Sequence, residues 1–148
     1  MITVESVISV STTVVGCAAP LVTREHKKVQ TVLVVEDEAH IRQFVAVNLK
    51  ARGYAVLQAG SAEEGLQQLR DYAPDALILD IKLPGMSGWD MLKQVAADPE
   101  LPDIPVIIVA ASFPADHTGE QTYTHIAEIY IKPISATDLI AAVRRILG

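Results

Sequence analysis

The stretch that decides the fold is ALILDIKLPGMSG, residues 76–88. Its first four residues are apolar, Asp80 follows them, and a turn rich in Pro and Gly comes next. An uninterrupted apolar run of this kind is typical of a strand buried on both faces of a parallel sheet. A carboxylate at the end of such a strand lies at the carboxyl edge of the sheet, where open α/β folds place their functional groups.

Charged residues also follow two other apolar segments. The first segment, residues 31–35, leads into an acidic triplet at 36–38, and the second, residues 129–131, leads into Lys132. Because the carboxyl ends of parallel strands meet at one edge, we expect these groups to converge on Asp80. Taken singly, each has an ordinary explanation, such as solvating a loop or capping a helix. Together they describe a site for a divalent cation and a phosphoryl group.

Strand and helix patterns alternate along the chain. The predicted strands are residues 31–35, 54–59, 75–80, 104–109 and 129–131. The predicted helices are residues 39–51, 62–72 and 88–97, and a last helix that begins after Ser135. A fourth helix is expected within 113–127, although Gly119 and the poor helix formers at 122–124 weaken its pattern. The alternation predicts an α/β fold, a doubly wound five-stranded parallel sheet with helices on both faces.

The composition limits the class of protein. With 148 residues, half of them apolar, the chain is expected to form one globular domain. A net charge of −6 argues against non-specific binding to nucleic acid, which needs a basic surface. The single cysteine, Cys17, permits no internal disulfide and no CxxC metal site. This composition suits a reducing compartment, and we expect a cytoplasmic protein.

Residues 1–28 differ from the rest, and we place them outside the fold, with the folded domain at 29–148. They are either a disordered leader or a non-native extension that results from a start codon assigned upstream of the natural one. Residues 14–17, VVGC, resemble the lipid-attachment box of bacterial lipoproteins. However, no basic residue precedes the apolar stretch 7–22, polar residues interrupt it, and it is too short to span a bilayer. We therefore expect no membrane attachment.

Three segments resemble the receiver domains of two-component response regulators, a family that includes single-domain chemotaxis regulators. They are residues 34–38 (VVEDE), 79–88 (LDIKLPGMSG) and 130–133 (YIKP), each at a predicted strand end. The resemblance covers residues 30–147. It implies the flavodoxin-like (βα)5 receiver fold and a role in signal transduction, not that of an enzyme.

The resemblance implies a role for each charged residue. Asp80 matches the aspartate that accepts the phosphoryl group. Glu36 and Asp37 match the acidic pair that binds Mg²⁺ together with Asp80 and the backbone carbonyl of Lys82. Lys132 matches the lysine that contacts the phosphoryl oxygens. Physical chemistry agrees, because Mg²⁺ is commonly held by one or two carboxylates, waters and phosphate oxygens.

The resemblance also implies partners. The phosphoryl donor would be a sensor histidine kinase or a phosphotransfer protein. Because the last helix ends at Gly148, we expect a stand-alone receiver that contacts a downstream protein target or passes the phosphoryl group along a relay. Pro133 matches the proline after the site lysine, which is often cis in this family. The side chain of Lys82 is either a modulator of dephosphorylation or an ordinary solvated lysine.

The sequence departs from the family at two switch positions. The fourth strand usually ends in Thr or Ser, but here Ala110 cannot donate a hydrogen bond to the phosphoryl group. A hydrogen bond to a charged group contributes about 1.5–3 kcal/mol, which is comparable with a typical allosteric coupling of about 1–3 kcal/mol. Ser112 is the candidate substitute, but in an extended segment its side chain is expected to point away. The aromatic switch position falls on Ile129, and Tyr130 is expected on the opposite face of the strand.

Other functions were compared with the receiver interpretation. A phosphate-independent interaction module, or pseudo-receiver, agrees with Ala110 and Ile129. A phosphatase of the haloacid dehalogenase type needs an Asp-x-Asp-x-Thr motif, but Lys82 and Pro84 occupy its second and third fixed positions, so the required acid is absent. A flavin-binding protein needs a phosphate-binding loop after the first strand, where Glu36 and its acidic neighbours would repel the anion.

Overall fold

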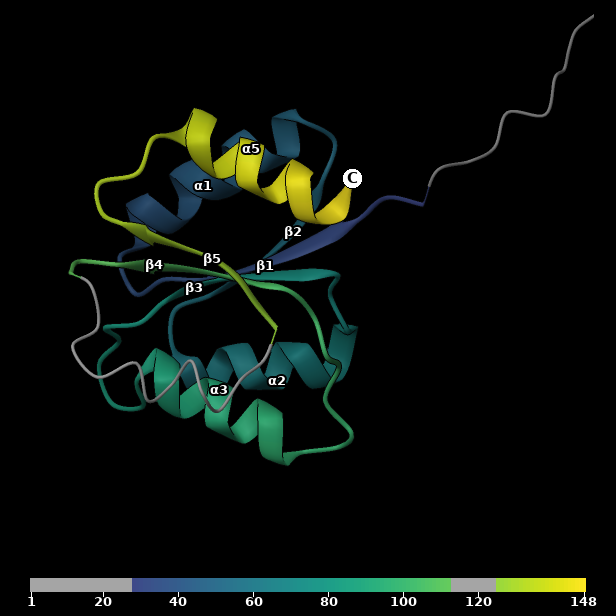
Figure 1. The fold of residues 1–148 in the computed structure, drawn as a ribbon, viewed down its shortest axis with the longest axis vertical. Helices are drawn as coiled ribbons and strands as arrows, with labels where there is room; N and C mark the ends of the chain where they lie inside the picture. The colour runs from purple at the N-terminus through teal and green to yellow at the C-terminus, as the bar shows by residue number, and fades with distance from the viewer. Residues whose placement is uncertain (1–27, 113–124) are drawn as a thin grey trace, which may run out of the picture.

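The computed structural model describes residues 28–112 and 125–148, which form one parallel sheet with helices on both faces (Figure 1). The strands are β1 (Thr31–Val35), β2 (Ala55–Ala59), β3 (Ala76–Asp80), β4 (Val106–Ala110) and β5 (Ile126–Ile131). The helices are α1 (Ala39–Ala51), α2 (Ala62–Tyr72), α3 (Gly88–Ala97) and α5 (Ala136–Leu147). The strand order β2-β1-β3-β4-β5 is that of the flavodoxin-like fold, as the sequence predicts.

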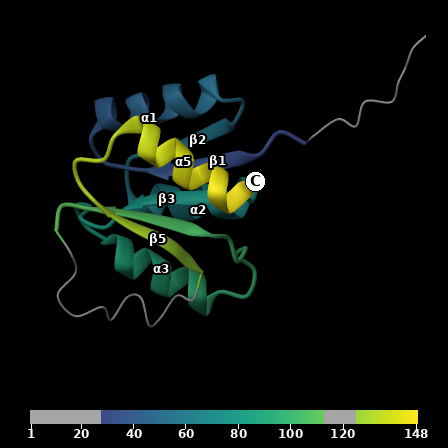
Figure 2. The same ribbon diagram turned by 45° about the horizontal axis from the view of Figure 1, so that its top comes forward.

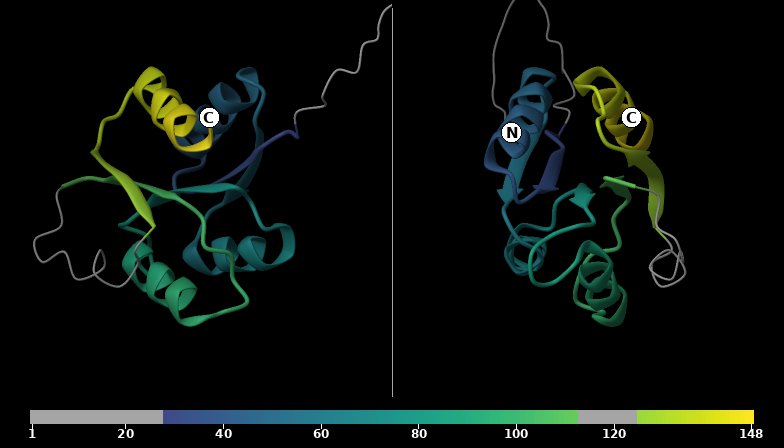
Figure 3. Two further views of the ribbon diagram at one scale, coloured as in Figure 1. Left: turned by 45° about the vertical axis from the view of Figure 1, so that its right-hand side comes forward. Right: turned by 90° about the vertical axis from the view of Figure 1, so that its left-hand side faces the viewer.

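Different helix pairs cover the two faces of the sheet. Helices α1 and α5 lie on one face, and α2 and α3 lie on the other (Figures 2 and 3). All of β3 is buried, with Leu77 and Leu79 packed on the α2–α3 side and Ile78 on the α1–α5 side. Burial on both faces explains why this strand is apolar without interruption. By the same alternation, Asp80 follows Ile78 on the α1–α5 side.

Most elements have the expected bounds. The predicted limits of β1, α1, α2 and α3 are confirmed, and β2 and β3 each begin one residue later than predicted. β4 begins at Val106 instead of residue 104, because Pro105 has no N–H to donate to a neighbouring strand. β4 then continues to Ala110, one residue beyond its predicted end.

β5 is longer than the sequence suggested. The assignment of residues 126–127 to a fourth helix is wrong, because both belong to β5. Ile126 pairs with Val106, and the register then shifts so that Glu128 pairs with Ile107. This bulge adds one residue to β5 and makes its apolar pattern irregular.

Some expectations fall outside the described residues. These are the leader apart from Lys28, its cysteine motif at 14–17, and most of the expected helix within 113–127. Within 28–112 and 125–148, none of the helices is long and apolar enough to cross a membrane.

Serine residues begin three of the described helices. The hydroxyls of Ser61 and Ser135 each accept a hydrogen bond of 3.1 Å from the backbone N–H three residues later. Ser87 forms a capping box with Asp90, in which each side chain accepts from the other residue's backbone N–H. This box fixes the start of α3 shortly after Asp80, so the loop that follows the carboxylate is held at both ends.

Gly88 packs closely behind the same loop. Its N–H donates a hydrogen bond of 2.8 Å to the carbonyl of Ile81. A Cβ atom at position 88 would lie 2.8 Å from the carbonyl oxygen of Asp80 and 2.8 Å from the Cα of Ile81. Both contacts are with backbone atoms, which can move away only if the loop shifts.

We expect Gly88→Ala to lower the free energy of unfolding by about 1–3 kcal/mol, the usual cost of overpacking. Urea denaturation would measure this change. Gly60→Ala is the control, because its Cβ would meet the flexible end of Arg42 no closer than 3.4 Å. Equal stability of the two variants would contradict the expectation.

Candidate functional site

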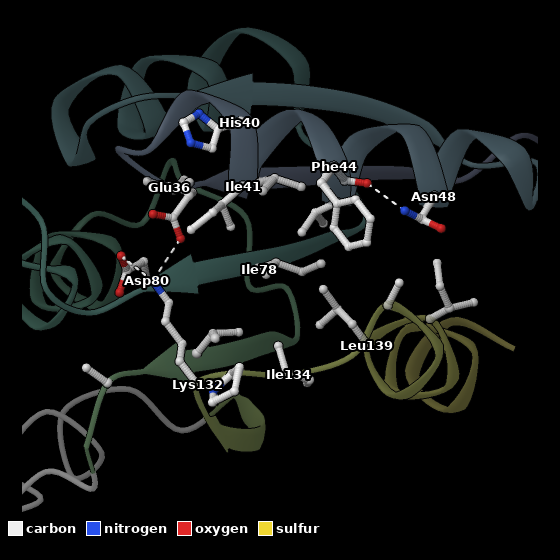
Figure 4. A pocket seen from close by; sticks show the side chains of 18 residues that line it. Glu36, His40, Ile41, Phe44, Asn48, Ile78, Asp80, Lys132, Ile134 and Leu139 are labelled. Carbon is white, nitrogen blue, oxygen red and sulfur yellow. Dashed lines mark hydrogen bonds and ion pairs between the residues drawn. The ribbon is translucent and has the colours of Figure 1, made fainter.

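Glu36, Asp80 and Lys132 meet at the carboxyl edge of the sheet (Figure 4). Glu36 follows β1, Asp80 ends β3 and Lys132 follows β5. The Nζ atom of Lys132 donates to Glu36 Oε1 at 3.1 Å and to Asp80 Oδ2 at 3.2 Å. The peptide bond between Lys132 and Pro133 is cis. Lys132 therefore joins Glu36 and Asp80, which are 96 and 52 residues away from it in the sequence, into one cluster.

Both carboxylates are buried, since Glu36 is 6% exposed and Asp80 is 5% exposed. Backbone groups supply further hydrogen bonds to them. The N–H of Glu38 donates to Glu36 Oε2 at 3.2 Å, and the N–H of Lys82 donates to Asp80 Oδ1 at 3.2 Å. Each carboxylate thus has one ammonium donor and one backbone donor, which offset part of the cost of burying its charge.

The electrostatic balance differs between the members of the cluster. Burial raises the pKa of Glu36 above its ordinary value of 4.5, and the negative charge of Asp80 adds to this rise. The hydrogen bonds from Lys132 and from the N–H of Glu38 lower that pKa but do not cancel the effect of burial. For Lys132, burial lowers the pKa, but the hydrogen bonds to both carboxylates outweigh it and raise the pKa above 10.5. The lysine therefore stays charged, and Glu36 carries negative charge that is incompletely compensated.

Asp37 extends the carboxylate pair into a possible cation site. One carboxylate oxygen each from Glu36, Asp37 and Asp80 lies within 4.8 Å of the others. Asp37 is exposed, so one side of the triad faces solvent. Hard oxygen ligands with an open side fit Mg²⁺, which keeps several waters and binds few carboxylates. Glu38, the last residue of the acidic triplet, is outside this group and contributes only its N–H.

Arg42 also positions the site, although its sequence position gave no signal of this. Its Nη1 atom donates to the carbonyl of Glu36 at 2.7 Å, and the N–H of Glu36 donates to the carbonyl of Ala59 at 3.0 Å. The backbone of Lys132 is held in a similar way, because its N–H donates to the carbonyl of Ala110 at 2.7 Å. The charged side chains therefore extend from anchored backbone.

Ala110 lines a hollow of about 330 Å³ beside the acidic cluster. Ala111 and Ser112, the two residues after β4, line the same hollow, and the direction expected for the Ser112 side chain stays a prediction. Ser87 and Lys82 also line the hollow, and Lys82 is exposed and forms no ion pair with any residue in the described ranges.

Ile129 and Tyr130 lie on opposite faces of β5, as the strand alternation predicts. Ile129 packs against the α2–α3 core, and Tyr130 packs against the α1–α5 core. The hydroxyl of Tyr130 donates to Glu128 and accepts from Arg145 Nη2 at 2.7 Å. Arg145 also forms an ion pair with Glu128 at 2.7 Å. Tyr130 is therefore part of a network that joins β5 to α5.

Comparison with known proteins was made for sequence and for structure. Residues 32–144 match the family described as Response regulator receiver domain. The chain is 32% identical over 118 residues to the phosphate regulon transcriptional regulatory protein PhoB of Pseudomonas aeruginosa, covering 80% of this chain and 52% of that protein. It is 33% identical over 119 residues to the probable transcriptional regulator ycf27 of Guillardia theta, covering 80% of this chain and 45% of that protein. The chain thus spans about half the length of these curated relatives.

Solved structures agree with these matches. A putative response regulator from Chloroflexus aurantiacus superimposes with a TM-score of 0.71 at 31% identity, covering 81% of this chain and 98% of that one. The chemotaxis protein CheY4 of Vibrio cholerae gives a TM-score of 0.74 at 24% identity, covering 81% of this chain and 100% of that one. At this lower identity the second likeness supports the fold alone.

The raised pKa of Glu36 predicts a pH dependence of stability. A carboxyl group that binds its proton more tightly when folded favours folding at low pH, and this contribution is lost as the pH rises from 4.5 through the raised pKa. Glu36→Gln stays neutral throughout. In metal-free buffer, its stability relative to the wild type should therefore increase as the pH rises through this window.

Urea unfolding at several pH values, with EDTA present, would measure the difference. Glu63→Gln, at an exposed position on α2, is the control for loss of a surface carboxylate. A Glu36→Gln difference that stays constant or falls as the pH rises would contradict the assignment.

Proposed function

The chain belongs to the family of response regulator receiver domains, and we propose that it accepts a phosphoryl group on Asp80 from a histidine kinase or phosphotransfer protein. The observation that supports this most is the placement of Lys132 Nζ, 3.1 Å from Glu36 and 3.2 Å from Asp80. A buried carboxylate at a strand end, beside a lysine and two further carboxylates, has the charges needed for transfer of an anionic group.

The proposed reaction is a displacement at phosphorus. A carboxylate oxygen of Asp80 forms a bond to phosphorus, and the bond from phosphorus to the donor nitrogen of a phosphohistidine breaks. The imidazole nitrogen keeps the electron pair of that bond. Lys132 contacts the oxygens of the transferred group and offsets their charge. The backbone donors to Glu36 and Asp80 keep both carboxylates oriented.

Glu36, Asp37 and Asp80 are the residues that would hold Mg²⁺, with the backbone carbonyl of Lys82 as a further ligand. A bound Mg²⁺ would offset the repulsion between the incoming phosphoryl group and the three carboxylates. The partly compensated charge of Glu36 and the open side at Asp37 support this assignment. Both charge balance and ligand type favour a hard cation.

The proposed output is a protein contact or a phosphorelay step, as befits a signalling module and not an enzyme. The named relatives PhoB and ycf27 are transcriptional regulators, and this chain matches about half of each. The proposed setting is the cytoplasm, a reducing compartment that suits a chain with a single cysteine. The net charge of −6 disfavours nucleic acid as a direct partner of this chain.

A second candidate function is a phosphate-independent interaction module. Ala110 favours it, because its side chain offers no donor to a phosphoryl group at the end of β4. Ile129 favours it too, because β5 packs the aliphatic residues Ile126 and Ile129 against the α2–α3 core that contains Ala110. The two candidates differ in whether Asp80 accepts a phosphoryl group, because the interaction module would act without one.

We expect acetyl phosphate and Mg²⁺ to add one phosphoryl group to the wild type, as read by intact mass, and none to Asp80→Asn. Asp71→Asn, an exposed carboxylate on α2, is the matched control and should be labelled at the wild-type rate. Asp37→Asn should slow labelling by at least about tenfold, because it removes one carboxylate from the proposed Mg²⁺ site. Equal labelling of wild type and Asp80→Asn would remove Asp80 as the acceptor.

Ala110→Thr should strengthen the response to phosphorylation. The hollow beside Ala110 has room for the added atoms, and the new hydroxyl should add a coupling of about 1–3 kcal/mol. With beryllofluoride and Mg²⁺, amide NMR shifts should remain near Glu36 and Asp80 in the wild type and reach β5 in the variant. Ala97→Thr, at an exposed position at the end of α3, is the control. Identical shift patterns in Ala110→Thr and wild type would contradict this role of the missing hydroxyl.

A further inference from the structure

A deep apolar groove of about 650 Å³ lies between α1 and α5. The acidic cluster lies at one end of it, and most of the other lining residues are apolar, among them Ile41, Phe44, Val45, Ile134, Leu139 and Ile140 (Figure 4). Phe44 is 57% exposed and Ile41 is 36% exposed, although both are large apolar side chains. The polar lining residues outside the acidic cluster are His40 and Asn48, and the side-chain amide of Asn48 donates to the carbonyl of Phe44 at 2.8 Å. The groove therefore suits an apolar, uncharged occupant.

The described chain begins close to this groove. The side chain of Gln30 donates to the carbonyl of Leu147 at 2.9 Å, which places the start of β1 against the end of α5. Figure 1 shows the same arrangement, with the start of β1 and the C-terminus on one side of the molecule. Val29, at the point of entry, is itself 59% exposed. A segment that precedes Val29 thus starts next to the α1–α5 face.

The sequence before this point has the required chemistry. Residues 7–22, VISVSTTVVGCAAPLV, contain no charged side chain and are mostly apolar. Only residues 23–29 separate this segment from Gln30, and seven residues reach up to about 23 Å when extended. Leu147 lies about 10 Å along α5 from Ile140, a lining residue, and the lining residues of α1 span about 12 Å, from His40 to Asn48. The segment is therefore long enough to cover the whole groove.

We propose that residues 7–22 bind in the α1–α5 groove of their own chain and cover Phe44 and Ile41. Tethering favours this occupant, because a short linker gives a bound segment a millimolar effective concentration. Burial of the exposed apolar side chains supplies the driving force. This inference does not depend on phosphorylation of Asp80.

Cys17 makes a direct test possible, because it is the single cysteine of the chain and lies within the segment. A nitroxide spin label on Cys17 of the full chain broadens NMR signals of nearby methyl groups. The methyl signals of Ile41 and Leu139 should lose intensity relative to the reduced, diamagnetic label. Those of Leu66 and Leu92, in the α2–α3 core, should keep it.

Two lysine substitutions on α1 give a matched comparison. Phe44→Lys places a charge in the groove and should restore the intensity of the groove signals. Val47→Lys is on the same helix, at a side chain that is 64% exposed and outside the groove lining, and it should leave the broadening unchanged. Both positions are exposed, so both variants should fold.

A mixed sample distinguishes a second copy from the chain's own segment. Isotope-labelled Cys17→Ser chains are combined with unlabelled, spin-labelled chains, and we expect the groove signals to keep their intensity. Broadening in this mixture would assign the groove to another copy and overturn the proposal. It would also be overturned by no broadening in the single-chain sample, or by equal broadening on both faces of the sheet.

Discussion

The structure depends most on two carboxylates, Glu36 and Asp80, that are buried side by side at the end of the sheet. Like charges in a poorly solvated position repel each other strongly, because the effective dielectric constant is low there. Lys132 bridges the pair, and backbone N–H groups complete the hydrogen bonds. The raised pKa of Glu36 indicates that this compensation is partial. The remaining negative charge is what makes an additional cation favourable at this edge.

The apolar sheet provides the rigidity that such a cluster needs. β3 is buried along its whole length, and its neighbour β1 is buried at all but its first residue, so neither strand end can move without disturbing both cores. Arg42 and the capping box at Ser87 then fix the loops that leave these strands. The functional side chains thus extend from a frame that is held by apolar packing, separate from the charged cluster. This separation allows the site to tolerate poorly compensated charge.

The sequence predicted best what depends on local pattern. Helix limits followed from serine caps such as Ser61, and the strand carrying Asp80 followed from its continuous apolar run. β5 was less predictable, because its bulge interrupts the alternation and, among the described strands, only β4 pairs with it. The contact of Arg42 with the end of β1 depends on how α1 crosses the sheet, which no spacing in the sequence specifies. The groove beside Phe44 was missed for the same reason, since it results from the separation of α1 and α5.

The two faces of β5 explain how acceptance of a phosphoryl group and the response to it can be separated. Ala110 and Ile129 lie on the α2–α3 side, and neither side chain has a polar group that could contact a phosphoryl group. The ring of Tyr130 lies on the other side, where Glu128 and Arg145 hold its hydroxyl. Because a shift of one residue changes the face of a strand, rotation of a side chain cannot bring Tyr130 next to Ala110. Tyr130 therefore connects β5 to α5 and is not among the residues that line the hollow beside Ala110.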